Sequence, residues 1–302
     1  MTIEQLNIWK FVDGKAGHEK QSEGLLQGLH QICNSVQVEE VAPNLRFSRN
    51  TLRSLNKKLP PHLLVGAGHD VHLPILRCKL AFGGKSVLLM RPSLPNWFFN
   101  LLLIPSHDST GNFGNVVHTE GPLCPVSVAD KDSNLGLILL GGPSKHSEWD
   151  HAVVVAAVGT IVSKNPSIQW KLCDSRRTPE STLSSLPDYP NCSKHPCQEV
   201  SPDFLQSEMA RSQFAWVTSD SVSMVYECLA HQISTGVIDT QGTSSKKPSK
   251  VSKTIDQLVT SATVHRFSED EPILNGSVST SAGQENTRCA QVVWDRLVEN
   301  EV

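Results

Sequence analysis

Two patterns of apolar and polar residues follow one another along the chain from the N-terminus. Short, mostly apolar runs such as 7–14 (NIWKFVDG) are typical of strands, and the segments between them, such as 18–33, place apolar residues at helical spacing. The first half continues in the same way, with strands predicted at 36–43, 62–68, 85–92 and 100–108 and a helix at 71–82. This β-α-β-α order predicts a parallel sheet covered by helices.

A segment rich in proline, glycine and small polar residues, 119–134, is the best candidate linker. After it the alternation restarts, with strands predicted at 135–142, 167–175, 214–220 and 233–240 and helices at 151–162, 178–186, 221–230 and 286–299. Thr178 is the expected cap of its helix, and 241–253 is expected to be an exposed basic loop. We therefore expect two α/β domains, 1–130 and 131–302, with the last helix as a candidate to pack back on the first domain.

The composition excludes several classes of protein. The chain has 302 residues, of which 38% are hydrophobic and 19% charged, so it can bury two cores and is not a disordered protein. Its formal net charge of −3 gives no broad electrostatic reason to bind nucleic acid. The densest apolar run, 97–105, is too short to span a bilayer, and the N-terminus has no signal-peptide pattern. We expect a cytoplasmic protein, with peripheral membrane contact left open.

Eight scattered cysteines are expected to be reduced and mostly buried rather than joined in disulfides. Cys192, His195 and Cys197 lie close together in the sequence, but a zinc site would need a fourth ligand. We expect no metal here and an ordinary loop at 191–197.

Three polar turns of the second half each follow a predicted strand: 141–146 (GGPSKH), 174–179 (DSRRTP) and 218–224 (TSDSVSM). Ligands of open α/β sheets bind at the carboxyl edge of the strands, where such turns gather. The sequence therefore predicts a ligand site at this edge, formed by the three turns together.

The third turn opens a helix near Ser221, whose free backbone N–H groups and dipole favour an anion such as a phosphate. Ser223 and Glu227 share one face of this helix, so a diphosphate at its start would place a ribose near the Glu227 carboxylate. The alternative is that Asp220 caps the helix and Glu227 lies on a solvated face.

The other two turns carry basic residues that suit a phosphate. Arg176 and Arg177 directly follow a strand, and arginine binds phosphate with two donors at once, although adjacent arginines are often only a surface pair. Lys145 follows Gly-Gly-Pro-Ser and can meet a phosphate as a point charge. Neither a Walker A spacing nor a G-x-G-x-x-G turn is present, so neither a P-loop nor a nicotinamide cofactor is indicated.

The first strand leads into a glycine-rich turn, DGKAGHEKQ at 13–21. Gly14 and Gly17 permit close approach of a ligand to the backbone, and His18 falls on the first helical turn. Because an imidazole transfers protons near neutral pH, His18 is a candidate general base; a histidine that caps the helix is the alternative.

Six motifs, taken in their order along the chain, resemble those of the mitochondrial fission "elongated mitochondria" family, from about residue 8 to residue 240. They are DGKAGHEKQSEGL, LLVGAG, IPSHD, GGPSKHSEWD, SRRTP and VTSDSVSMVYECLA. The resemblance implies a GT-B fold, in which two Rossmann-like domains face a cleft, and a glycosyltransferase activity with a nucleotide-sugar donor. It places the donor site in the C-terminal half: Ser144, Lys145, Ser221 and Ser223 at the diphosphate and Glu227 at the ribose.

The same resemblance places Gly17 and His18 where the acceptor meets the donor phosphate, and it implies neither a metal nor another cofactor. The chain departs from the family pattern at Tyr226 and Cys228, which flank the glutamate, and at His69, where arginine is common. A second reading therefore stays open, a non-catalytic fission factor on the mitochondrial outer membrane that recruits a dynamin-related GTPase. A third, a sugar epimerase, would need a nicotinamide fingerprint that the sequence lacks.

Overall fold

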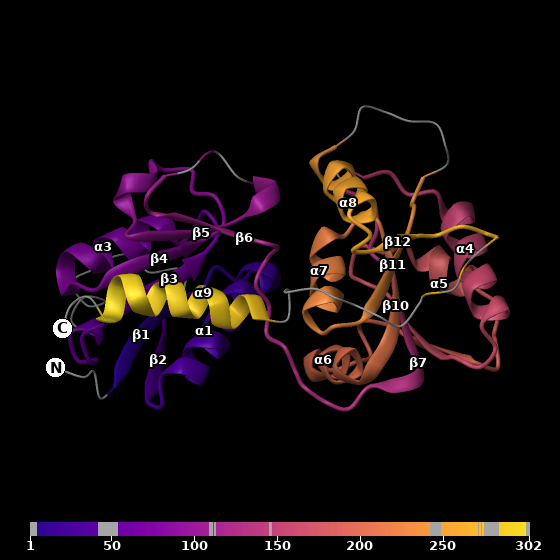
Figure 1. The fold of residues 1–302 in the computed structure, drawn as a ribbon, viewed down its shortest axis with the longest axis horizontal. Coiled ribbons are helices and arrows are strands. Elements are labelled where there is room, and N and C mark those ends of the chain that lie inside the picture. The colour runs from indigo at the N-terminus through magenta and orange to yellow at the C-terminus, as the bar shows by residue number, and fades with distance from the viewer. Residues whose placement is uncertain are drawn as a thin grey trace. The chain divides into compact units, whose positions relative to one another are not determined.

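The computed structural model describes residues 5–41, 54–108, 111, 113–144, 147–241, 249–270, 272, 274 and 284–299. The chain forms two compact units, the first made of Met1–Pro125 and Gln284–Val302 and the second of Val126–Gly283. The division falls inside the segment predicted as a linker, and the last helix, α9 (Glu285–Val293), lies within the first unit (Figure 1).

The first unit is built on a six-stranded parallel sheet of order β2-β1-β3-β4-β5-β6. Its strands are β1 (Leu6–Phe11), β2 (Val36–Val41), β3 (Leu63–Ala67), β4 (Lys85–Leu89), β5 (Leu101–Pro105) and β6 (Val116–Thr119). Its helices are α1 (Ala16–Ile32), α3 (His72–Phe82), the single turns η1 (Asn96–Phe98) and η2 (Ser106–Asp108), α9, and the π-helical turn η4 (Trp294–Val298).

Both faces of this sheet are buried, which explains why its strands read as nearly continuous apolar runs. Leu63 and Val65 of β3 pack on one face with Leu25 of α1 and with the inner side of α9. Leu64 points to the opposite face, where Ile75 of α3 covers it. The strand period of two thus divides neighbouring residues between two cores.

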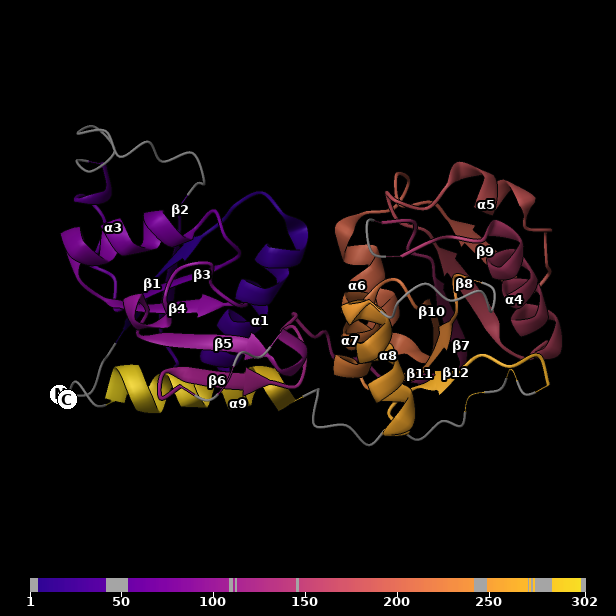
Figure 2. The ribbon, with the colours of Figure 1, turned by 90° about the horizontal axis from the view of Figure 1, so that it is seen from above.

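The second unit has a six-stranded parallel sheet of order β12-β11-β10-β7-β8-β9. Its strands are β7 (Asp132–Leu139), β8 (Gln169–Cys173), β9 (Cys192–His195), β10 (Ser212–Thr218), β11 (Ser234–Ile238) and β12 (His265–Arg266). Helices α4 (His151–Lys164) and α5 (Glu180–Ser185) cover one face, and α6 (Pro202–Arg211), α7 (Val222–Ala230) and α8 (Lys250–Thr260) cover the other (Figure 2).

In each unit the order of strand addition reverses once. The reversal lies between β1 and β3 in the first unit and between β7 and β10 in the second. The loops after these strands leave the sheet on opposite faces, and ligands of doubly wound folds bind between such loops. The two reversal points are therefore the places to search for function.

The prediction of two parallel α/β units is confirmed, but several elements escaped it. Residues 191–197 were expected to be a loop, yet Cys192–His195 form the edge strand β9. The basic segment 241–253 was expected to be a loop; α8 begins inside it at Lys250, and 242–248 lie outside the described residues. Among the described helices, none is both long and apolar enough to cross a membrane.

Candidate functional site

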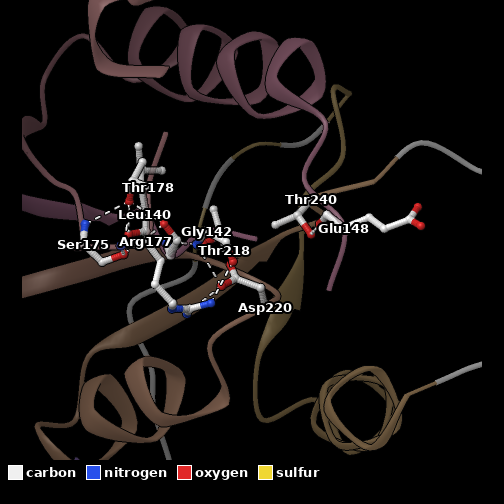
Figure 3. Close-up of polar contacts among 10 residues, drawn as sticks. Leu140, Gly142, Glu148, Ser175, Arg177, Thr178, Thr218, Asp220 and Thr240 are labelled. Carbon is white, nitrogen blue, oxygen red and sulfur yellow. Dashed lines mark hydrogen bonds and ion pairs between the residues drawn. The ribbon is translucent and has the colours of Figure 1, made fainter. Parts of the chain in front are cut away.

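Three turns of the second unit interlock at the carboxyl ends of β7, β8 and β10 (Figure 3). The Gly141 N–H donates to Thr218 Oγ1 over 2.7 Å, and the Gly142 N–H donates to Asp220 Oδ2 over 2.9 Å. These two bonds join the turn after β7 to the turn after β10, the pair of loops at the strand-order reversal.

Arg177 brings in the turn after β8. Its Nη1 donates to the Gly142 carbonyl over 2.7 Å, and its Nη2 binds Asp220 Oδ2 over 2.9 Å (Figure 3). The Asp220 side chain is fully buried and that of Arg177 is 42% exposed. A Cβ at Gly142 would lie 2.1 Å from the Arg177 carbonyl oxygen, so only glycine fits at that position.

Thr178 contributes to the same arrangement and does not cap a helix, which corrects the sequence prediction. Its hydroxyl donates to the carbonyls of Leu140 and Gly141, and Ser175 Oγ also donates to the Gly141 carbonyl, over 3.0 Å. Helix α5 begins after Pro179 and receives no side-chain cap. The Thr178 hydroxyl therefore binds the turn after β7, where the Leu140 and Gly141 carbonyls accept from it.

The start of α7 answers the question left open about Asp220. Because that carboxylate accepts from Gly142 and Arg177, it does not cap the helix: the N-cap is Ser221, with no side-chain hydrogen bond at the cap. Half-buried Ser221 and exposed Ser223 lie at the helix start. The first turn of α7 thus keeps the positive end of its dipole uncapped by any described side chain.

Glu227 lies one turn deeper in α7 than Ser223 and is only 9% exposed. The alternative of a solvated face residue is therefore wrong. The Glu227 carboxylate is thus a buried charged group one turn behind the uncapped start of α7.

Two further predicted residues of this edge, Ser144 and Arg176, lie at the surface. Ser144 is exposed, and its backbone exchanges two hydrogen bonds with that of Ser147, over 3.0 and 3.4 Å. Arg176 is exposed. Lys145 lies outside the described residues. The structure thus brings Arg177 into contact with the turns after β7 and β10, while Arg176 and Ser144 remain at the surface.

A second polar cluster lies at the strand-order reversal of the first unit. His18 Nδ1 is 2.7 Å from Asp13 Oδ2, and the Asp13 side chain is fully buried. Lys15 Nζ lies 3.3 Å from the same Asp13 oxygen and 2.8 Å from Asp70 Oδ2, which joins the loop after β1 to the loop after β3. His18 therefore contacts a buried carboxylate and does not cap α1, whose N-cap is Lys15.

The charges around Asp13 favour its ionised form. Burial alone would raise the pKa of Asp13, but hydrogen bonds from His18 and from the Lys15 backbone lower it below its ordinary value. Gly14 and Gly17, which were expected to admit a ligand, have no atom within 4 Å of the position a Cβ would take. Open space thus adjoins the turn that holds His18.

Asp13, Asp70 and Asp220 were not predicted as site residues. Asp13 and Asp220 lie at the ends of predicted strands and Asp70 follows one, so the signal was an acidic residue at a strand end. A metal site was considered at Cys192, His195 and Cys197. In the part of the chain that the structure describes, no group of three metal-ligating side chains occurs. Cys192 lies in β9, where burial raises its pKa to about 11.

The chain has two six-stranded parallel sheets, each flanked by helices and each with polar turns at the point where the strand order reverses. This arrangement is the GT-B class of fold. The chain belongs to the family described as Mitochondrial fission ELM1, whose model matches residues 16–297. The resemblance read from the motifs is therefore confirmed.

Similar proteins agree with this class. The "Uncharacterized protein RP120" of Rickettsia prowazekii (strain Madrid E) is 21% identical over 283 residues, which cover 74% of this chain and 80% of that protein. A protein from Listeria monocytogenes assigned as a UDP-N-acetylglucosamine 2-epimerase superposes with a TM-score of 0.59 at 8% identity, covering 99% of this chain and 98% of its own. The glycotransferase of kitacinnamycin gives a TM-score of 0.53 at 10% identity, covering 97% and 99%. At these identities the likeness concerns the fold.

Proposed function

We propose that this chain is a glycosyltransferase of GT-B type that takes a nucleotide-diphospho-sugar as donor, with the donor bound to the second unit. The observation that carries the proposal is the uncapped start of α7 beside the locked Gly141–Gly142 turn, at the strand-order reversal. Such a site attracts an anionic group on two grounds, free N–H donors and the helix dipole.

In this proposal the diphosphate accepts from the first-turn N–H groups of α7 and from the hydroxyls of Ser221 and Ser223. Ser144, Lys145 and Arg176 bind it from the neighbouring turns. Such donors stabilise the charge that develops on a departing diphosphate.

Arg177 and Glu227 have separate tasks in the proposal. Arg177 already binds Asp220 and the Gly142 carbonyl, so it holds the turn in shape and faces the diphosphate only with its exposed side. Glu227, one turn into α7, accepts hydrogen bonds from the ribose hydroxyls. The names of two similar structures, a UDP-N-acetylglucosamine 2-epimerase and a glycotransferase, support a nucleotide-linked sugar as the ligand class.

The first unit supplies the acceptor side. Gly14 and Gly17 leave room beside the turn that carries His18, and His18 accepts the proton of the attacking hydroxyl.

Calorimetric titration with UDP, GDP, ADP and their sugar conjugates tests the proposal. We expect at least one to bind, and we expect Glu227→Gln to weaken it about tenfold or more, or about 1.4 kcal/mol, because the ribose loses a charged acceptor. Glu208→Gln is the matched control: Glu208 is also a buried glutamate of the second unit, at 6% exposure, and it forms an ion pair with Lys171. Equal affinities in wild type and Glu227→Gln would contradict the ribose role.

Membership of the fission family favours a second candidate, a scaffold that recruits a dynamin-related GTPase to a membrane surface. The same titration separates the two. A scaffold would bind none of the nucleotides at millimolar concentration and would retain a dynamin-related GTPase in a pull-down, and Glu227→Gln would leave that capture unchanged.

A further inference from the structure

The Asp13 carboxylate is held so firmly that it dictates where the proton on His18 resides. Asp13 Oδ1 accepts from the Lys15 backbone N–H over 3.1 Å, and Asp13 Oδ2 faces His18 Nδ1 at 2.7 Å. An ionised carboxylate has acceptors only, and the pKa of Asp13 lies below its ordinary value. The proton of a neutral His18 ring must therefore lie on Nδ1, which leaves the Nε2 lone pair free.

The ring itself has little freedom to turn. A Cβ at Gly68 would lie 2.2 Å from His18 Nδ1 and 2.4 Å from its Cε1, so the loop after β3 closes directly on that edge of the imidazole. Gly68 has φ +88, which L side chains rarely adopt. The His18 side chain nevertheless remains 21% exposed, so solutes reach the ring.

Lys15 is the cation of this cluster. Its ammonium bridges Asp13 and Asp70, so the carboxylate that faces His18 is anchored by a cation as well as by a backbone donor.

We propose that Asp13 is the positioning residue of a catalytic pair, in which it sets the tautomer and orientation of His18 so that Nε2 receives the proton of a hydroxyl acceptor. The inference rests on the proposed glycosyltransferase function and adds to it a residue that the sequence motifs did not assign. Buried carboxylates fulfil this task for histidine bases on unrelated folds.

In this proposal the sugar is transferred in a single displacement. The acceptor hydroxyl oxygen forms a bond to the anomeric carbon while the bond from that carbon to the diphosphate breaks, and its electron pair stays on the diphosphate. The hydroxyl proton passes to His18 Nε2, and the imidazolium later releases it to solvent. A single displacement inverts the configuration at the anomeric carbon.

The substitution Asp13→Asn tests the role of Asp13, because asparagine has almost the same shape as aspartate but carries no charge. The amide oxygen must meet the fixed Lys15 N–H, so the NH2 group faces His18 and forces Nδ1 to become an acceptor. The proton then moves to Nε2, the wrong tautomer. Nitrogen-15 NMR of the imidazoles, with the His18 signals assigned from His18→Gln, reads this directly and needs no substrate.

We expect Nδ1–H in the wild type, Nε2–H in Asp13→Asn, and Nδ1–H again in Asp70→Asn, which removes a partner of Lys15 but touches no atom of His18. In hydrolysis of UDP-N-acetylglucosamine, with water as acceptor, kcat should fall 10²–10⁴-fold in Asp13→Asn while KM stays unchanged. Equal turnover in wild type and Asp13→Asn, absence in both included, overturns the catalytic role.

The outcomes separate the two proposals. A wild-type ring with its proton on Nε2 overturns the inference even if nucleotides bind to the second unit. The expected tautomers together with no nucleotide binding support the proton arrangement and overturn the proposed function.

Discussion

Buried titratable side chains hold the loops at the sheet edges of both units. Asp13 and Asp220 have fully buried side chains, and each accepts from a backbone N–H and from a cationic or imidazole side chain of a neighbouring segment. His72 is equally hidden, at 2% exposure, at the start of α3. Its Nδ1 lies 3.3 Å from Ser93 Oγ, so it joins α3 to the loop after β4. At the residue scale, each of these groups is a point where protonation and folding are coupled.

Acid should destabilise the first unit through His72. Burial, and to a lesser extent the nearby His69, lowers the pKa of His72 from 6.5 to about 4. The unfolded chain therefore binds more protons between these two pH values, and stability falls as the pH drops from 6.5 to 4, by roughly 3 kcal/mol in full. Urea unfolding of the first unit at pH 7 and pH 4.5 measures this.

His72→Gln keeps a polar group for Ser93 but does not titrate, so its unfolding free energy should depend less on pH than that of the wild type. His30→Gln is the control, because His30 is exposed and should leave the pH dependence unchanged. The same pH dependence in His72→Gln and wild type would show that His72 is not responsible.

At the element scale, α9 packs on α1 of the first unit, the unit on which the last helix was expected to pack. Cys289, Ala290 and Val293 of α9 belong to the core beneath α1. A Cβ at Gly28 of α1 would lie 2.3 Å from the Asn286 carbonyl oxygen of α9, so the two backbones approach as closely as glycine allows. The helix that ends the chain is thereby part of the first core.

Gly28→Ala should destabilise the first unit by about 1–3 kcal/mol, because a backbone oxygen cannot move aside as a flexible side chain does. Gly17→Ala, in the same helix and with nothing within 4 Å of the added Cβ, should be neutral or stabilising by up to about 1 kcal/mol. Thermal unfolding of the two variants checks the pair. Equal shifts in both would mean that α9 does not pack on Gly28.

At the scale of the whole molecule, the two units differ in how the chain builds them. The second is one continuous stretch, Val126–Gly283, whereas the first needs Gln284–Val302 from the far end of the chain. Its core includes Val298 of η4 as well as the residues of α9. Folding of the first unit must therefore wait for the last residues, while the second unit is complete before them.

A fragment of residues 126–283 should fold alone, because its two cores contain residues of that stretch only. Deletion of residues 284–302 from the full chain should leave the second unit folded and expose the first to proteolysis. Hydrogen exchange of both proteins measures this: protection of β7 and β10 should persist, and protection of β1 and β3 should be lost. Retained protection of β1 and β3 would contradict the prediction.

The sequence alone predicted most of the strands and helices, the parallel sheets, the segment in which the chain divides and the three turns at one sheet edge. It could do so because these features depend on local periodicity and on glycine and proline placement. It missed the helices α6 and α8 and the edge strands β6, β9 and β12, which have only two to four residues each and become ordered by pairing with a neighbouring strand.

Only the tertiary structure decided which residues of those turns act together. The Gly142–Asp220 bond spans 78 positions and the Arg177–Asp220 bond 43, and no local pattern encodes either partner. Asp13 is only five positions from His18, but it became a candidate only when the fold showed that its carboxylate is fully buried and that the distant Gly68 closes on the imidazole. Local sequence determines the helices and strands because backbone conformation depends on near neighbours in the chain. The fold determines which side chains form a site because hydrogen bonds depend on distance through space.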